Sequence, residues 1–83
     1  MNDLGLSYFA NQQFEMALDK FTKAVDMDHE NSIYLNNKGL TLTNLDRLDV
    51  AIIDFERSIM MNNKDSRTFY NRANVLIEQK KYR

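Results

Sequence analysis

The chain has 83 residues, of which 11 are basic and 12 acidic, so its net charge is −1 at neutral pH. It has no cysteine, which excludes a disulfide framework and a cysteine-based metal site, and the near-neutral charge argues against nucleic-acid binding. No apolar run reaches the roughly 18 residues of a membrane span, and the first residues lack a signal-peptide layout. We therefore expect one small domain, residues 1–83, in an intracellular, cytoplasmic protein.

Apolar residues recur at spacings of three and four along the first half of the chain, which predicts helices. The first predicted helix occupies residues 1–11, and the second begins at Phe14 and covers about fourteen residues. A polar loop then precedes a third helix over residues 32–44. Asn31 or Ser32 can accept the free amides that open it.

The second half of the chain repeats this layout. Asn44 or Asp46 can take the left-handed backbone conformation in the next turn. A fourth helix is predicted over residues 48–61, and a fifth opens at Asp65 or Ser66 and ends before the polar residues 79–81. The absence of proline supports an almost wholly helical chain of five helices.

Sliding the sequence against itself by 34 residues, without a gap, brings small residues onto small ones and bulky residues onto bulky ones. Gly39, for example, aligns with Gly5 upstream and with Ala73 downstream, and Phe55 aligns with Phe21. Such a fixed period is typical of stacked helical units, each too small to bury its apolar face alone. The period divides the chain into residues 1–31, 32–65 and a partial unit, 66–83.

The matching positions resemble those of the tetratricopeptide repeat, a 34-residue unit with the pattern W-x2-L-G-x2-Y, then A-x3-F, then P. The second unit reads Leu35-x2-Lys38-Gly39-x2-Leu42, followed by Ala51-x3-Phe55, and Asn63 stands where proline is usual. Lysine at the leucine site and the missing proline are departures from the pattern. The resemblance implies an all-α fold, a right-handed superhelical stack of antiparallel helix hairpins.

Packing between the helices is expected to depend on small residues where helices cross and on bulky residues beside each crossing. Gly39 and Ala51 are the small residues of the second unit, and Leu42 and Phe55 are the bulky ones. The full set of expected packing residues is Gly5, Tyr8, Ala17, Phe21, Gly39, Leu42, Ala51, Phe55, Ala73 and Leu76.

The resemblance also implies a concave groove lined by the first helix of each unit. Residues that the packing stripe leaves unused there are apolar or carry amides, which suits binding of an extended peptide or a partner helix. The expected groove residues are Leu6, Phe9, Ile33, Asn36, Asn37, Leu40, Arg67, Tyr70, Asn71, Asn74 and Ile77. We therefore predict a non-enzymatic scaffold for protein or peptide partners of unknown identity.

Two known binding modes of the family can be compared with these residues. Asn37 and Asn71 lie one period apart, and this spacing resembles the asparagine ladder in the superhelix of O-linked N-acetylglucosamine transferase. A second mode clamps a C-terminal carboxylate with two lysines, two asparagines and an arginine. Asn37 and Arg67 fit that clamp, whereas Asn2, Leu6 and Asn71 do not, so we expect no such clamp here.

The distribution of charge suggests an alternative. Residues 1–31 are acidic, whereas residues 66–83 hold five basic residues against one acidic residue. Two copies could stack head to tail through these ends, in a structural, self-associating role that uses the uncapped last helix. The apolar character of that helix favours a fragment of a longer array, in which further repeats cover this end.

No pattern points to catalysis, to a cofactor or to a metal site. The one histidine, His29, lies in a polar loop, and the chain has no glycine-rich phosphate loop. The carboxylates Asp46, Asp49, Asp54 and Glu56 are expected on a solvated helix face. We therefore expect a protein that is not an enzyme.

Overall fold

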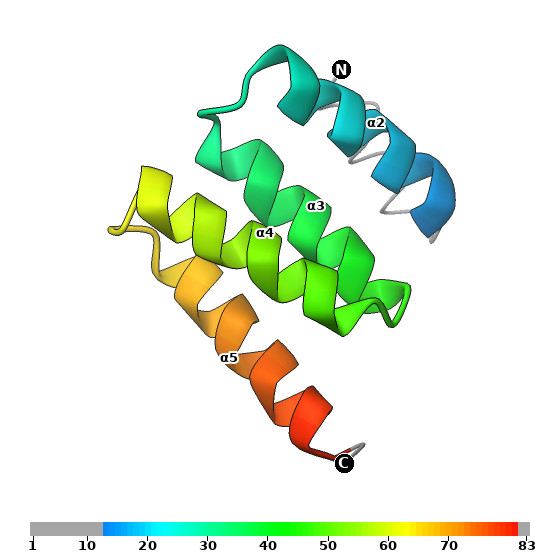
Figure 1. Cartoon of the computed structure of the whole chain (residues 1–83), viewed down its shortest axis with the longest axis vertical. Coiled ribbons are helices and arrows are strands. Elements are labelled where there is room, and N and C mark those ends of the chain that lie inside the picture. Colours follow the sequence, from blue (N-terminus) through cyan, green and yellow to red (C-terminus); the bar gives the residue numbers. More distant parts are fainter. Residues whose placement is uncertain (1–12, 82–83) are drawn as a thin grey trace.

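The computed structural model describes residues 13–81, and every regular element among them is a helix (Figure 1). The helices are α2 (Phe14–Met27), α3 (Ser32–Asn44), α4 (Leu48–Met61) and α5 (Ser66–Lys81). Their bounds follow the predicted ones closely. The first predicted helix, with its expected groove and packing residues, lies outside the described residues; these are Gly5, Leu6, Tyr8 and Phe9.

Polar side chains and backbone geometry set the helix boundaries. The Asn31 side chain accepts hydrogen bonds from the backbone N–H groups of Ile33 and Tyr34, at 3.0 and 3.2 Å, which confirms Asn31 as the cap of α3. Asp46 has a φ of 61° in the turn before α4, which confirms that one of the two proposed residues is left-handed there. Asp65 accepts the Arg67 backbone N–H at 3.0 Å and opens α5.

The end of α5 differs from the sequence prediction. The helix includes residues 79–81, where a polar break was expected. No glycine or proline interrupts this segment, and Lys80 and Lys81 place positive charge beside the negative end of the helix dipole. The polar character of these residues therefore reflects exposure rather than a turn.

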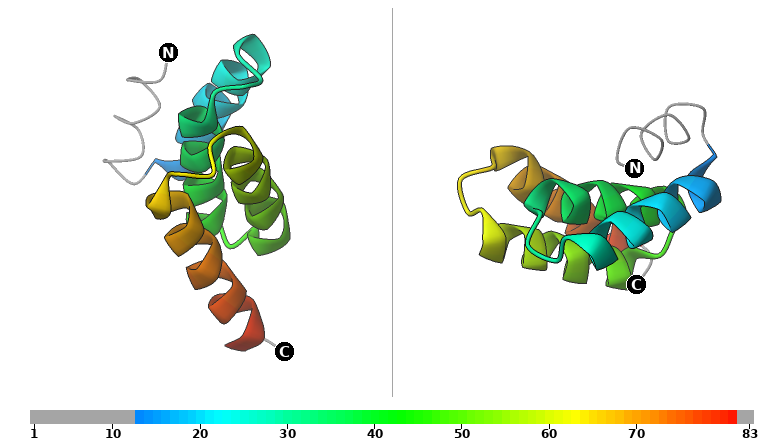
Figure 2. Two further views of the ribbon diagram at one scale, coloured as in Figure 1. Left: turned by 90° about the vertical axis from the view of Figure 1, so that its left-hand side faces the viewer. Right: turned by 90° about the horizontal axis from the view of Figure 1, so that it is seen from above.

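Successive helices run in opposite directions and pack side by side, which confirms the predicted all-α stack of antiparallel hairpins. α3 packs against both α2 and α4, and α5 packs against α4 and touches α3. Two further views place α3 and α5 along one side of the stack and α2 and α4 along the other (Figure 2). The hydroxyl of Ser58 in α4 also donates to the carbonyl of Ser32 at the start of α3, at 2.8 Å.

The core lies between these two layers. Leu42, Ala51, Phe55 and Val75 form one cluster of buried side chains from α3, α4 and α5. Gly39 stands directly against Phe55, because a Cβ built on Gly39 would lie only 2.6 Å from the nearest ring carbon. Ala17 and Phe21 in α2 are buried as well. The small and bulky residues of the second unit therefore meet in one interface.

Two expected packing residues are not buried. Ala73 is exposed, and 46% of Leu76 is accessible to solvent. Both lie on the side of α5 that no described helix covers, whereas their counterparts in α3 are covered by α4. Their expected packing role is thus not realised among the described residues, because the helix that would bury them is not among these elements.

Asp54 corrects the expectation that the acidic residues of α4 lie on a solvated face. It is only 2% exposed, and its Oδ2 lies 3.6 Å from the Nζ of Lys38. Burial raises the pKa of Asp54 above its ordinary value, although the neighbouring Lys38 and Arg57 act in the opposite direction. Lys38, which stands at a site where leucine is usual, therefore has an acidic partner in α4, the facing helix.

Candidate functional site

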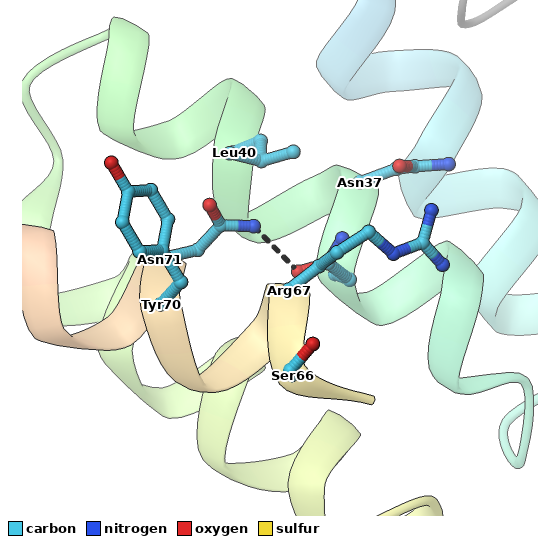
Figure 3. A pocket seen from close by; sticks show the side chains of 7 residues that line it. Asn37, Leu40, Ser66, Arg67, Tyr70 and Asn71 are labelled. Atoms are coloured by element: carbon cyan, nitrogen blue, oxygen red, sulfur yellow. Dashed lines mark hydrogen bonds between the residues drawn. The ribbon is translucent and has the colours of Figure 1, made fainter. Parts of the chain in front are cut away.

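An open hollow of about 650 Å³ lies between α3 and α5 (Figure 3). The sequence predicted six of its lining residues and missed Ser66, which lies beside Arg67 in the first turn of α5. The hollow is lined by Asn36, Asn37, Leu40, Ser66, Arg67, Tyr70 and Asn71. A serine in a helix's first turn is common as part of a cap, so its sequence context carried no binding signal.

Several expected groove residues do not line this hollow. Ile33 is half exposed at the start of α3, and Asn74 and Ile77 are exposed further along α5. Ile77 instead lines a separate hollow near the end of α5, together with Leu76, Gln79 and Lys80. Leu6 and Phe9 lie outside the described residues.

The floor of the hollow contains a hydrogen bond between the two helices. The Nδ2 of Asn71 donates to the Oδ1 of Asn36 at 3.0 Å (Figure 3). Asn36 is only 6% exposed, so it joins α3 to α5 and does not offer its amide to a ligand. Asn71 has a second N–H and a carbonyl oxygen, both of which remain chemically capable of bonding to a peptide.

Arg67 is tied to a neighbour. Its Nε and Nη2 donate to the two carboxylate oxygens of Asp65, at 3.1 and 3.0 Å. Hydrogen bonds from Arg67 hold the pKa of Asp65 below its ordinary value, and Asp65 in turn raises the pKa of Arg67. The single cation of the hollow is therefore already paired, and the site has little net attraction for an anion.

Apolar contact surface comes from one residue on each helix. Leu40 projects from α3 and Tyr70 from α5, and the tyrosine is 68% exposed (Figure 3). Asn37 lies on the α3 side of the same hollow, one period before Asn71. The arrangement combines amides that can bond to a peptide backbone with an exposed aromatic ring against which a side chain can pack.

Two other kinds of site, a metal centre and a membrane-spanning helix, are absent from residues 13–81. No group of three or more acidic or histidine side chains there is arranged to hold a metal ion. None of the helices in this part of the chain is long and apolar enough to cross a membrane. The α3–α5 hollow is the candidate binding site because amides and apolar side chains line it together.

Residues 33–65 match a family model that is described as a tetratricopeptide repeat. The peroxisomal targeting signal receptor of Candida glabrata is 30% identical over 70 residues, which is 84% of this chain and 12% of the receptor. Human DnaJ homolog subfamily C member 7 is 33% identical over 58 residues, 70% of this chain and again 12% of the relative. The chain therefore spans about an eighth of the curated relatives it matches.

Structural comparison gives the same fold. The first repeat domain of Spaghetti (RPAP3), bound to the HSP90 peptide SRMEEVD, superposes with a TM-score of 0.91 at 22% identity, over 96% of this chain and 65% of that one. The Yersinia enterocolitica secretion chaperone SycD, in complex with a peptide of the translocator YopD, has a TM-score of 0.91 at 20% identity, over 94% of this chain and 60% of that one.

Proposed function

We propose that this chain is a non-enzymatic module that binds an extended peptide segment of another protein. It carries a tetratricopeptide repeat at residues 33–65 and has the fold of tetratricopeptide solenoids. The binding site is the hollow between α3 and α5. Support comes first from its lining, to which each of the two helices contributes amides and one apolar or aromatic side chain. Neighbours of the same fold that were solved with bound peptides are consistent with this function.

The observation that carries the proposal is the joint placement of Asn37, Leu40, Tyr70 and Asn71 around one open hollow. Amides at the repeat spacing can bond to the N–H and C=O groups of an extended chain whatever its sequence. Leu40 and Tyr70 supply the apolar contact that selects a side chain. The ligand is therefore an extended segment with at least one apolar or aromatic residue.

The charge of the hollow favours a ligand other than an acidic tail. Its one cation, Arg67, is held by Asp65 in a two-bond ion pair. A carboxylate ligand would have to compete with Asp65 for the guanidinium, and no second cation lines the hollow. A neutral or weakly charged peptide with an apolar anchor fits better.

Selection from a peptide library tests this proposal. Binding of the selected peptide should weaken about tenfold in Tyr70→Ala, through loss of apolar contact, and two- to tenfold in Asn37→Ala, through loss of one hydrogen bond. Met60→Ala is the matched control, since Met60 is 81% exposed and lies on α4. Binding that is unchanged in Tyr70→Ala and in the Asn37→Ala, Asn71→Ala double variant would reject the site.

A further inference from the structure

An apolar stripe runs along the exposed side of α4, in the layer of the stack opposite α3 and α5 (Figure 2). Its residues are Val50, Ile53, Arg57 and Met60, at helical spacings of three and four. Val50 is 46% and Ile53 55% exposed, and Met60 is more exposed still. Three large apolar side chains therefore lie in solvent on one face, around a single cation. We refer to these four residues as the α4 outer face.

The equivalent face of α2 shows that this exposure does not depend on which helices follow. One period earlier, the same positions hold Met16, Asp19, Lys23 and Asp26. All four are exposed, although α3, α4 and α5 come after them in the stack. The stack therefore leaves this face in solvent, and the residues on it are not required for packing between the repeats.

The two faces differ in their chemistry. On α2, the Nζ of Lys23 lies 3.2 Å from the Oδ2 of Asp19, and Asp26 adds a further charge, so the face is polar and well hydrated. On α4, the counterparts of these two aspartates are Ile53 and Met60. Neighbouring apolar side chains that are exposed on one face are a feature of surfaces that bind another molecule.

The shortage of polar groups on the α4 outer face favours a helix over an extended segment as the occupant. An extended segment would bring its backbone N–H and C=O groups against apolar side chains that offer them no hydrogen bonds. A helix bonds its backbone groups internally and can lay one apolar stripe along another. From Val50 to Met60 the face covers about three turns, or about 15 Å, which sets the length of the partner helix.

Arg57 determines the charge that fits this face. Its Nη1 lies 3.9 Å from the Oδ1 of Asp54, and the Nζ of Lys38 lies 3.6 Å from the other carboxylate oxygen. Two cations thus share one buried carboxylate, so this group of three side chains has a surplus of positive charge. The Arg57 side chain is 44% exposed and presents that charge between Ile53 and Met60. A carboxylate is the group that pairs best with a guanidinium.

The remaining acidic residues of α4 do not neutralise Arg57. Asp49 accepts a hydrogen bond from Gln79 of α5, and Glu56 follows it by seven residues, on the same side of the helix. Among residues 13–81, Arg57 has an ion pair with Asp54 alone. The complementary charge is therefore expected from a partner.

We propose that the α4 outer face is a second interaction surface, which docks an amphipathic helix of another protein. The partner helix has an apolar stripe of about three turns and an Asp or Glu opposite Arg57. Met60 suits such a contact because its unbranched side chain adapts to the shape of a partner. The surface lies in the layer opposite the hollow and does not depend on the function proposed there, so the chain can hold two partners at once (Figure 2).

Selection from a library of stapled helices of about fifteen residues tests this proposal. The library carries apolar residues at the spacing of the α4 outer face and every residue type at the central position. Anisotropy titrations of a selected helix should show binding that Val50→Glu weakens at least tenfold, through a charge in the apolar contact. Met16→Glu is the matched control, since Met16 is the counterpart of Val50 on α2 and is 47% exposed. If no selected helix depends on Val50, the proposal is overturned.

The central position of the selected helices tests the role of Arg57. It should be enriched in Asp and Glu, and Arg57→Gln should weaken binding about fivefold, the effect of one partly exposed ion pair. Arg57→Glu combined with a central lysine in the helix should recover most of the affinity, whereas either change alone should not. Recovery also shows that the Arg57→Glu protein is folded. Selected helices without an acidic centre, or equal affinities for Arg57→Gln and the parent chain, would overturn the charge assignment.

Three further measurements separate this surface from other sites and occupants. Tyr70→Ala lies in the hollow and should leave the affinity for the selected helix unchanged, and a loss there would place the helix in the hollow. A dimer mass in sedimentation that disappears with Val50→Glu would overturn the proposal in favour of a second copy. Flotation with vesicles of phosphatidylcholine and phosphatidylserine that Val50→Glu abolishes would overturn it in favour of a lipid surface.

Discussion

The contact between Gly39 and Phe55 yields a prediction in which two effects have opposite signs. Glycine within a helix costs about 1 kcal/mol relative to alanine, so helix propensity alone predicts that Gly39→Ala stabilises the protein by about that amount. The structure predicts the reverse. The new Cβ would lie 2.6, 2.8 and 2.9 Å from three carbons of the Phe55 ring, where ordinary contacts are longer than about 3.4 Å.

The ring cannot move away easily, since Phe55 is fully buried between helices. Relief of overpacking in a core typically costs about 1–3 kcal/mol, and a rigid aromatic ring places this site toward the upper end. After subtraction of the helix-propensity gain, Gly39→Ala should lower the free energy of unfolding by about 1–2 kcal/mol. For a chain of this size that is a fall of about 4–16 °C in melting temperature.

Urea unfolding followed by circular dichroism measures this quantity, and Phe55→Leu tests its cause. Leucine at position 55 removes the ring atoms that the Cβ would meet, so Gly39→Ala should be neutral or stabilising in the Phe55→Leu background. The two substitutions should therefore show an interaction energy of at least about 1 kcal/mol. Stabilisation by Gly39→Ala in the parent chain, or additive effects of the two changes, would refute the steric argument.

Three further predictions concern the same helices. Phe55→Ala should lower the free energy of unfolding by about 3–5 kcal/mol through loss of buried surface and creation of a cavity, and a loss below about 2 kcal/mol in chemical denaturation would contradict the assigned packing. Asn31→Ala should cost about 1 kcal/mol because two amides at the start of α3 lose their acceptor, whereas Asn31→Ser, which keeps an acceptor and places no second carboxylate beside Asp28, should cost less. Burial raises the pKa of Asp54, so the folded state binds a proton more tightly than the unfolded state, and stability falls as pH rises from the ordinary aspartate value through the raised one. Melting temperatures of Asp54→Asn should thus shift upward relative to the parent across that window, and a difference that does not depend on pH would contradict this assignment.

Much of the fold could be predicted because the period and the polar breaks are local signals. Asn31 and Asp46 mark turns by their own chemistry, and the bounds of α3 and α4 follow from them. Asp54 was predicted to be exposed because it is an aspartate. Its spacing indicated burial, since it lies three residues after Ala51 and four before Ser58, on the buried face of α4. Lys38 stands at a site that is usually apolar, and this was the signal that the facing helix buries a carboxylate.

Less of the candidate site than of the fold could be predicted from the sequence, for two physical reasons. A repeat period identifies equivalent faces, yet it does not show whether a covering helix is present, which is why Ala73 and Leu76 were expected in the interior. Hydrogen bonds between side chains depend on the separation of the helices as well as on spacing along the chain. The sequence placed Asn36 and Asn71 on one side of the stack, but not in contact with each other.

That amide contact gives Asn71 two roles in the proposed function. Its side chain joins α3 to α5 at the floor of the hollow, and the same side chain lines the proposed peptide site. A peptide can bond to the second N–H or to the carbonyl oxygen of Asn71 while the contact with Asn36 stays in place. Substitution of Asn71 therefore removes a contact between helices together with a contact to the peptide, and the melting temperature of the variant separates the two losses.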